Sequence, residues 1–367
     1  MKYKISLHAV WLIAFSFACH HPVQDEMIPV SRHLIADTVY SYPHTYQDVG
    51  IKKSDRMIMV SPYYQGFVIL KNGHIIVVDP FNAGELHIYN IQTGQMEHLQ
   101  TGHSNYFSVS NNDDTRYRDA LLQLLPLSFY HFDMHSYYRY TLENDRVKLT
   151  RQNLRLQRVF ITRAIQLTEN KYVTLGFFRT GLLGLYDKES KRLNYYGHYP
   201  ISVAIPFERK AMESMVQSFQ GNIAYSDEHS QVVYASSNFA YLSCYHFTGS
   251  KLKFQWEKHI VPPPATKIVD GSIEIDNTVT QGGFSDVATA GDYIFASYTQ
   301  INIPDTTHSI LVYNMAGKHV ATCHIDSSIS DMMIDMEEGL LYGISRDVMW
   351  EPVIVRFHLG IAKKDAI

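Results

Sequence analysis

The chain lacks the features that mark several classes of protein. Only 3 of its 367 residues are cysteine, so a dense disulfide framework is excluded and the fold must depend on its hydrophobic core. The net charge is -4 and there is no run of Lys and Arg, so the clustered positive charge that nucleic-acid binding requires is missing. Beyond the N-terminus, no apolar run reaches the roughly 18 residues that a membrane-spanning helix needs.

Common catalytic and cofactor signatures are also missing. The sequence contains no GxSxG, no HExxH, no P-loop and no GxGxxG after a strand. We therefore predict no cofactor and find no motif that supports an enzyme. An enzyme whose site is assembled from scattered residues stays open as an alternative.

The N-terminus predicts export. Lys2 and Lys4 precede an apolar run from Ala9 to Ala18, which is too short to span the ~30 Å core of a bilayer. Ala18 followed by Cys19 resembles the lipobox of bacterial lipoproteins, in which signal peptidase II cleaves before a cysteine that becomes lipidated. The resemblance implies that Cys19 anchors the mature chain to a membrane, on the periplasmic or cell-surface side of the outer membrane. Ordinary cleavage near Ala18 is the alternative.

These features divide the chain into four segments. Residues 1–18 are the predicted lipoprotein signal peptide, and the polar residues 19–32, with two prolines, are a flexible tether. Residues 33–360 form one domain, and residues 361–367 are a C-terminal tail.

Strands dominate the predicted domain. Aromatic residues make up 13% of the chain and charged residues only 19%, a balance that suits half-buried pleated sheets. One phrase recurs: an apolar run ending in an aromatic residue, then a polar turn with Gly, Lys or Ser, then a second run. Such turns favour antiparallel hairpins. The copies are residues 85–99, 137–150, 182–196, 241–256 and 309–325, with a truncated copy at 352–360.

A second recurring pair of apolar runs lies upstream of these hairpins. Its copies are residues 66–79, 164–177, 222–236, 287–299 and 332–345. Two pairs give four strands per unit, and the units repeat at 44 to 68 residues, near the ~40 to 50 of propeller blades. We therefore predict an all-β, six-bladed β-propeller with four antiparallel strands per blade. A pair of packed β-sheets competes with it but does not explain the repeated hairpins.

The last unit ends after its third strand, which leaves an unpaired edge. Residues 33–42 have strand character and precede the first unit. We predict that they supply the outermost strand of the last blade and close the ring, with Ile35 to Tyr40 beside Val353 to Phe357. The alternative is a loosely packed N-terminal strand.

Long insertions occur at one point of the repeat, at residues 115–126, 205–219 and 262–283. Repeat proteins place such insertions on one face, often the binding face. The first two have helical spacing, with Tyr117, Leu121 and Leu124 on one stripe and Met212, Met215 on another. We expect short helical insertions that either cap the ring and present a face to a protein or glycan, or serve packing alone.

Together, the lipoprotein-like start, the loose repeats and the hairpin phrase resemble the TolB-like six-bladed propeller family of uncharacterised Gram-negative lipoproteins. The resemblance covers residues 33–360. It implies an exported propeller and no established catalytic residues.

The candidate site is a ring of polar residues that precede or begin equivalent inner strands. Aligning the units gives Gln65, Arg163, Asn222, Ser285, Asp286 and Asp331, with Thr162 and Ser330 beside them. With Arg163 facing the two aspartates, this ring suits a small polar ligand, a water cluster or a cation in the channel. The alternative is that these residues only satisfy backbone groups at strand ends.

Two further groups of residues are candidate functional motifs, and we assign no function to either. His131, Asp133 and His135 alternate on a predicted strand, where residues two apart lie ~7 Å from each other, so we assign no metal site. Cys244 and Cys323 fall in different repeats and are expected to be buried thiols, with a single bridge between them as the alternative.

The sequence thus gives two functional hypotheses. We favour a lipid-anchored binding or interaction module for a protein, glycan or small polar ligand. The alternative is a propeller hydrolase or lyase with a polar or metal site in the channel. The oligomeric state stays open.

Overall fold

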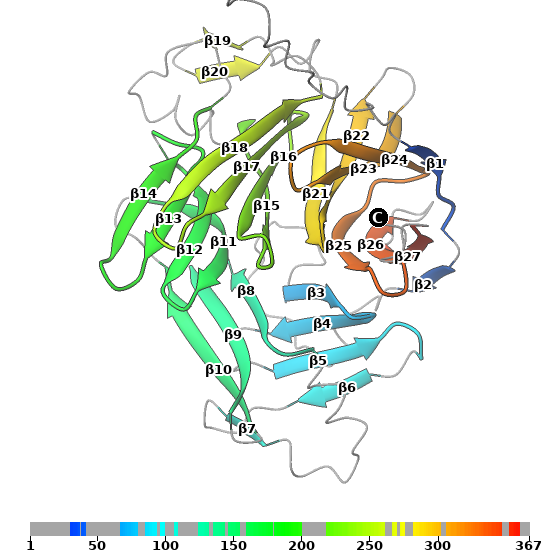
Figure 1. Cartoon of the computed structure of the whole chain (residues 1–367). Coiled ribbons are helices and arrows are strands. Elements are labelled where there is room, and N and C mark those ends of the chain that lie inside the picture. Colours follow the sequence, from blue (N-terminus) through cyan, green and yellow to red (C-terminus); the bar gives the residue numbers. More distant parts are fainter. Residues whose placement is uncertain are drawn as a thin grey trace, which may run out of the picture.

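The structure is a computed structural model. It describes residues 30–36, 38–41, 67–79, 85–93, 96–99, 106–108, 124–131, 135–143, 146–154, 159–178, 180–199, 218–260, 266–269, 272–275, 282–301, 306–346 and 352–359. Its strands form one five-stranded sheet, five four-stranded sheets and one two-stranded sheet. The larger sheets are arranged around a common centre, which confirms the all-β propeller fold (Figure 1).

The first three sheets follow one another along the chain. The first contains β3 (Phe67–Lys71), β4 (His74–Asp79), β5 (Glu85–Asn90) and β6 (Met96–Leu99). The second contains β7 (Tyr106–Ser108), β8 (Leu127–His131), β9 (Ser136–Glu143) and β10 (Arg146–Asn153). The third contains β11 (Ile161–Thr168), β12 (Lys171–Gly176), β13 (Leu183–Asp187) and β14 (Arg192–Tyr196).

The remaining large sheets complete the ring. One contains β15 (Gly221–Ser226), β16 (Gln231–Ser236), β17 (Tyr241–Phe247) and β18 (Leu252–His259). The next contains β21 (Gly282–Ala290), β22 (Tyr293–Ile301), β23 (Thr306–Asn314), β24 (His319–Ile325) and β1 (Val30–His33). The last contains β25 (Ser330–Asp335), β26 (Leu340–Arg346), β27 (Pro352–His358) and β2 (Thr38–Ser41).

The hydrophobic core explains why these sheets pack in a ring. Successive residues of a strand point to opposite faces, and the second strand of each large sheet is apolar on both faces. Ile75 therefore lies in one hydrophobic cluster with Tyr342 of a neighbouring sheet, while Ile76 lies in another cluster with Tyr140 of the sheet on the other side. The same division continues around the ring in the pairs Tyr137 and Tyr172, Val173 and Tyr234, Val233 and Ala296, and Phe295 and Leu341.

Each predicted hairpin with two strands is present, but one has a different place in its sheet. The hairpin β9–β10 was expected as the third and fourth strands. In the structure it supplies the two middle strands, with β8 inside it and the upstream strand β7 outside it. The predicted repeat missed β8 because the insertion at 115–126 separates β7 from β8 and interrupts the alternating pattern.

The N-terminal strand closes the ring as predicted. Strand β2 pairs antiparallel with β27, with Tyr40 opposite Ile354. The prediction of four antiparallel strands in every blade is wrong for one sheet, because β1 adds a fifth strand that pairs parallel to β24. Arg32 reinforces this contact, since its guanidinium donates to the carbonyl of Leu359 at 3.0 Å. Because β1 begins at Val30, residues 30–32 are paired strand rather than tether.

The insertions have different outcomes. The third contains a hairpin, β19 (Thr266–Val269) and β20 (Ser272–Ile275), which forms the two-stranded sheet. Most of the helical stretches predicted around Tyr117 and Met212 lies outside the described residues, and only Leu124 and Ser218 at their ends have helical backbone. Every secondary-structure element of the described ranges is a strand. Within the same ranges, no helix has the length and apolar character needed to cross a membrane.

The two later cysteines are free and buried. Cys244 packs between the sheets of β15–β18 and β21–β24, and Cys323 packs on the other side of the latter sheet. The bridge between them that the sequence left open does not form. Cys19, Gln65 and residues 361–367 lie outside the described residues.

Candidate binding site in the channel

The candidate site lies where the inner strands begin. Strands β11, β15, β21 and β25 are the innermost strands of successive sheets, and each contacts the next (Figure 1). Three of them have a β-bulge or other register irregularity near this end, between Ile161 and Arg163, between Phe284 and Asp286, and between Ser330 and Met333. A bulge leaves one residue unpaired and re-aims the neighbouring side chains, which is frequent beside binding sites.

Asp286 is the first acid of the site. Its Oδ2 accepts a hydrogen bond of 2.7 Å from the backbone N–H of Met332 on the adjacent inner strand. Burial, and to a smaller extent the nearby Asp331, raise its pKa to about 7 against the opposing effects of this hydrogen bond and of Arg163. The carboxyl group therefore changes between its neutral and charged forms near neutral pH.

Asp331 is the second acid. It adopts a positive φ of 48° at the irregular start of β25, a conformation that Asp tolerates better than most residues. Surrounding protein atoms raise its pKa by desolvation, while a hydrogen bond from the hydroxyl of Ser330 and the charge of Arg163 lower it. The residue is nevertheless exposed to solvent.

Arg163 is the cation of the site. Its positive charge lowers the pKa of both aspartates although its strand β11 is separated from β21 by β15 in the ring. The side chain is exposed, and in the described part of the chain its guanidinium forms no hydrogen bond or salt bridge. Its five N–H groups are therefore available to a ligand.

Asn222 and Ser285 have a structural role instead. The side-chain amide of Asn222 donates to the carbonyl of Ser285 at 2.9 Å, which links β15 to β21. The hydroxyl of Ser285 lies 2.7 Å from the carbonyl of Ile329 and 2.8 Å from the hydroxyl of Ser297. These contacts match the alternative in which polar residues here satisfy backbone groups.

The structure thus brings together Arg163, Asp286 and Asp331 from three different sheets. The backbone N–H of Met332 was missed, because the sequence carries no signal for a bulge that turns this group toward a neighbouring strand. His131 and His135 do not share a strand as expected, since β8 ends at His131 and His135 lies in the following turn with a φ of 46°.

The arrangement of the sheets defines a β-propeller with charged residues at the start of its inner strands, and one solved structure is similar to it in fold. No protein-family model and no curated protein matches the chain. A solved structure from Bacteroides vulgatus, of a member of the DUF4221 family, is similar with a TM-score of 0.50 at 9% identity, over 89% of this chain and 97% of that one. A Bacteroides fragilis protein assigned as exported has a TM-score of 0.40 at 10% identity, over 90% and 98% of the two chains.

Proposed function

We propose that the protein is a six-bladed, exported propeller, anchored through a lipidated Cys19, that binds a small polar ligand in its channel. The anchor and the export rest on the signal-like residues 1–18 and on the likeness to TolB-like lipoproteins. The observation that supports the ligand is the exposed guanidinium of Arg163, which has no hydrogen-bond partner within the described ranges and faces two carboxyl groups.

This arrangement favours a ligand with two kinds of polar group. A guanidinium pairs with a carboxylate or phosphate through two parallel hydrogen bonds. The pKa of the Asp286 carboxyl is raised to about 7 chiefly by burial. The group can therefore accept a hydrogen bond from a hydroxyl or amine when it is charged, and donate one when it is neutral. A small hydroxy acid or sugar acid carries both kinds of group.

The alternative, a hydrolase or lyase, is favoured by one observation. A general acid or base works best when its pKa lies near the working pH, and burial raises the pKa of Asp286 to about 7. In that reading Arg163 binds the anionic end of the substrate and Asp286 moves a proton. A protein or glycan partner on the insertion face is a further proposal that these residues do not address.

A screen of small hydroxy acids and sugar acids tests the proposal. Thermal shift identifies ligands, calorimetry measures their affinity, and NMR of the same mixtures detects turnover. We expect at least one ligand to lose about tenfold or more in affinity in Arg163→Gln, because a charged hydrogen bond is worth roughly 1.5–3 kcal/mol.

Arg192→Gln is the matched control, since it removes the same charge from the exposed residue of the outer strand β14. If Arg192→Gln binds the ligand as wild type does and Arg163→Gln binds it more weakly, the result supports the channel site. Equal affinity in both variants places the ligand elsewhere and contradicts the proposal. Turnover that is lost in Asp286→Asn identifies the enzyme instead.

A further inference from the structure

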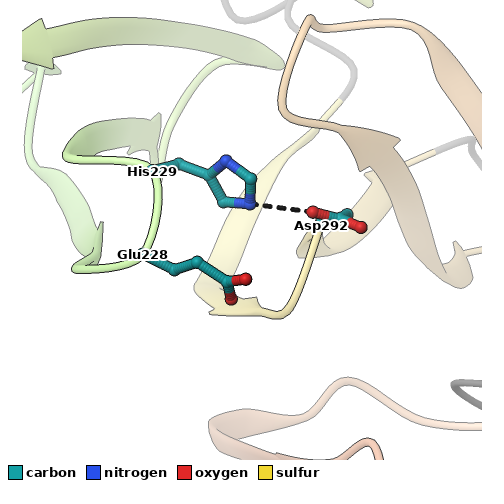
Figure 2. Close-up of side chains that lie close together, drawn as sticks. All are labelled: Glu228, His229 and Asp292. Atoms are coloured by element: carbon teal, nitrogen blue, oxygen red, sulfur yellow. Dashed lines mark ion pairs between the residues drawn. The ribbon is translucent and has the colours of Figure 1, made fainter.

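A second cluster of polar side chains lies where two neighbouring sheets meet at their inner turns. Glu228 and His229 belong to the turn between β15 and β16, and Asp292 belongs to the turn between β21 and β22 (Figure 2). One ligand atom from each residue lies within 4.8 Å of the others. Asp292 follows Asp286 by six residues, or about 20 Å along a strand, so this cluster is separate from the channel site.

The contact between His229 and Asp292 is close but is not a hydrogen bond. Nε2 of His229 lies 2.9 Å from Oδ1 of Asp292, within the distance of an ion pair. The same nitrogen is inaccessible to solvent and makes no hydrogen bond, so its contact with Asp292 is an ion pair alone. A buried ring nitrogen that lies beside a carboxylate without a hydrogen bond to it is an arrangement that a cation bound to both groups would satisfy.

Glu228 supplies the third side of the cluster. Figure 2 shows its carboxylate on the same side of the two turns as the His229–Asp292 contact. Two carboxylates held this close repel each other in the absence of a cation. Ligands of a tetrahedral zinc ion lie roughly 3.3 Å apart, given bonds of about 2.0 Å, so small side-chain rotations suffice to close the set.

We propose that Glu228, His229 and Asp292 bind a first-row divalent transition metal such as Zn²⁺. Imidazole together with carboxylate oxygens suits this class of ion, whereas Ca²⁺ prefers six to eight oxygen ligands. Because the ligands come from two sheets, the metal ties the β15–β16 turn to the β21–β22 turn. A metal that binds only the folded chain also raises the free energy of unfolding.

Competition with a chromophoric zinc chelator measures the affinity directly on the exported domain. We expect one Zn²⁺ site in the wild type that weakens about tenfold or more in His229→Gln and in Asp292→Asn, since even partners outside the ligand set change metal affinity by 10- to 100-fold. Ca²⁺ should not compete. Zn²⁺ should raise the melting temperature of the wild type and of neither variant.

Two variants control for loss of charge and of imidazole elsewhere. Glu337→Gln removes an exposed carboxylate from the equivalent turn of the next sheet, and His198→Gln removes an exposed histidine. Both should keep the wild-type affinity. Zinc binding that is equally strong in wild type and His229→Gln, or no binding in the wild type at micromolar zinc, overturns the proposal and leaves the cluster as an ion pair.

Discussion

The backbone N–H of Met332 donates to Oδ2 of Asp286 at 2.7 Å, and this bond joins the inner strands of two sheets. Asp286 itself follows the bulge of β21, and Met332 lies within the irregular start of β25. The two irregularities therefore aim a carboxylate and an N–H group at each other. One bond both positions the acid in the channel and couples its charge to the packing of the ring.

We predict that Asp286→Asn stabilises the protein at high pH. The pKa of Asp286 is about 7 in the folded state, against 3.8 for the free group, chiefly because burial disfavours the charged form. The folded state therefore holds the proton more tightly, and wild-type stability falls as pH rises from about 4 through 7. At pH 8 the free energy of unfolding of the variant should exceed that of wild type by on the order of 2 kcal/mol. This is less than a difference of about three pKa units would give, because the side chain is partly open to solvent.

Urea unfolding at pH 4.5 and pH 8 measures this difference. The variant should differ from wild type mainly at pH 8, because the carboxyl is largely neutral in the folded wild type at the lower pH. Asp326→Asn, at an exposed residue between β24 and β25, is the control and should show no such pH dependence. A variant that is less stable than wild type at pH 8 contradicts the assignment.

We predict that Gly283→Ala strongly destabilises the ring. A Cβ at Gly283 meets the carbonyl oxygen of Ser237 at 2.0 Å, and that oxygen belongs to the backbone of the bend that follows β16 in the neighbouring sheet. Neither backbone segment can move without disturbing the packing of β21 against its neighbour, so we expect the free energy of unfolding to fall by about 2–4 kcal/mol in thermal or urea unfolding. Gly343→Ala is the comparison, because its nearest neighbour is the side chain of Ile329 at 3.0 Å. If Gly283→Ala lowers the free energy of unfolding no more than Gly343→Ala does, the result contradicts close packing between Gly283 and Ser237.

The sequence predicted most of the fold, and the reason is local. Alternating apolar runs with polar turns specify hairpins through interactions between residues that are close in sequence. The hairpin of β17 and β18, in which Phe247 lies opposite Leu252, therefore pairs as expected. The unpaired third strand of the last unit also predicted a partner for β27. The parallel strand β1 and the outer place of β7 depend on contacts far apart in sequence, for which no local pattern exists.

The candidate site was predictable only in part. Repeat alignment identified Arg163, Asp286 and Asp331 because equivalent positions in a ring converge on one axis. It did not separate these residues from Asn222 and Ser285, whose polar groups are engaged by neighbouring backbone. The cluster at His229 was missed, because its residues come from turns of two different repeats and share no spacing.

We predict that β1 and β2 protect the end of the ring. A chain that begins at residue 42 lacks both strands, and the edges of β24 and β27 then become available to other molecules. Such a chain should unfold at lower temperature and associate as its concentration rises, as measured by calorimetry and by analytical ultracentrifugation. A chain that begins at Val30 is the control and should behave as the full domain does. Equal stability of both chains contradicts a closing role.

We predict that the two buried thiols are inert in the native state. Burial raises the pKa of Cys244 to about 12 and that of Cys323 to about 11, and the thiolate is the reactive form. A chromogenic disulfide reagent should therefore react with neither thiol until the protein is unfolded in urea. Rapid reaction of either thiol in native buffer indicates that the interfaces around β17 or β24 open.

Titration of the Asp286 carboxyl carbon by NMR tests the central claim most directly. If Arg163, Asp286 and Asp331 share one channel site, Asp286 titrates near pH 7 in the wild type. Asp331→Asn then lowers this pKa, because a repelling charge is removed, and Arg163→Gln raises it, because an attracting charge is removed. A pKa near 4 that neither substitution moves contradicts the account.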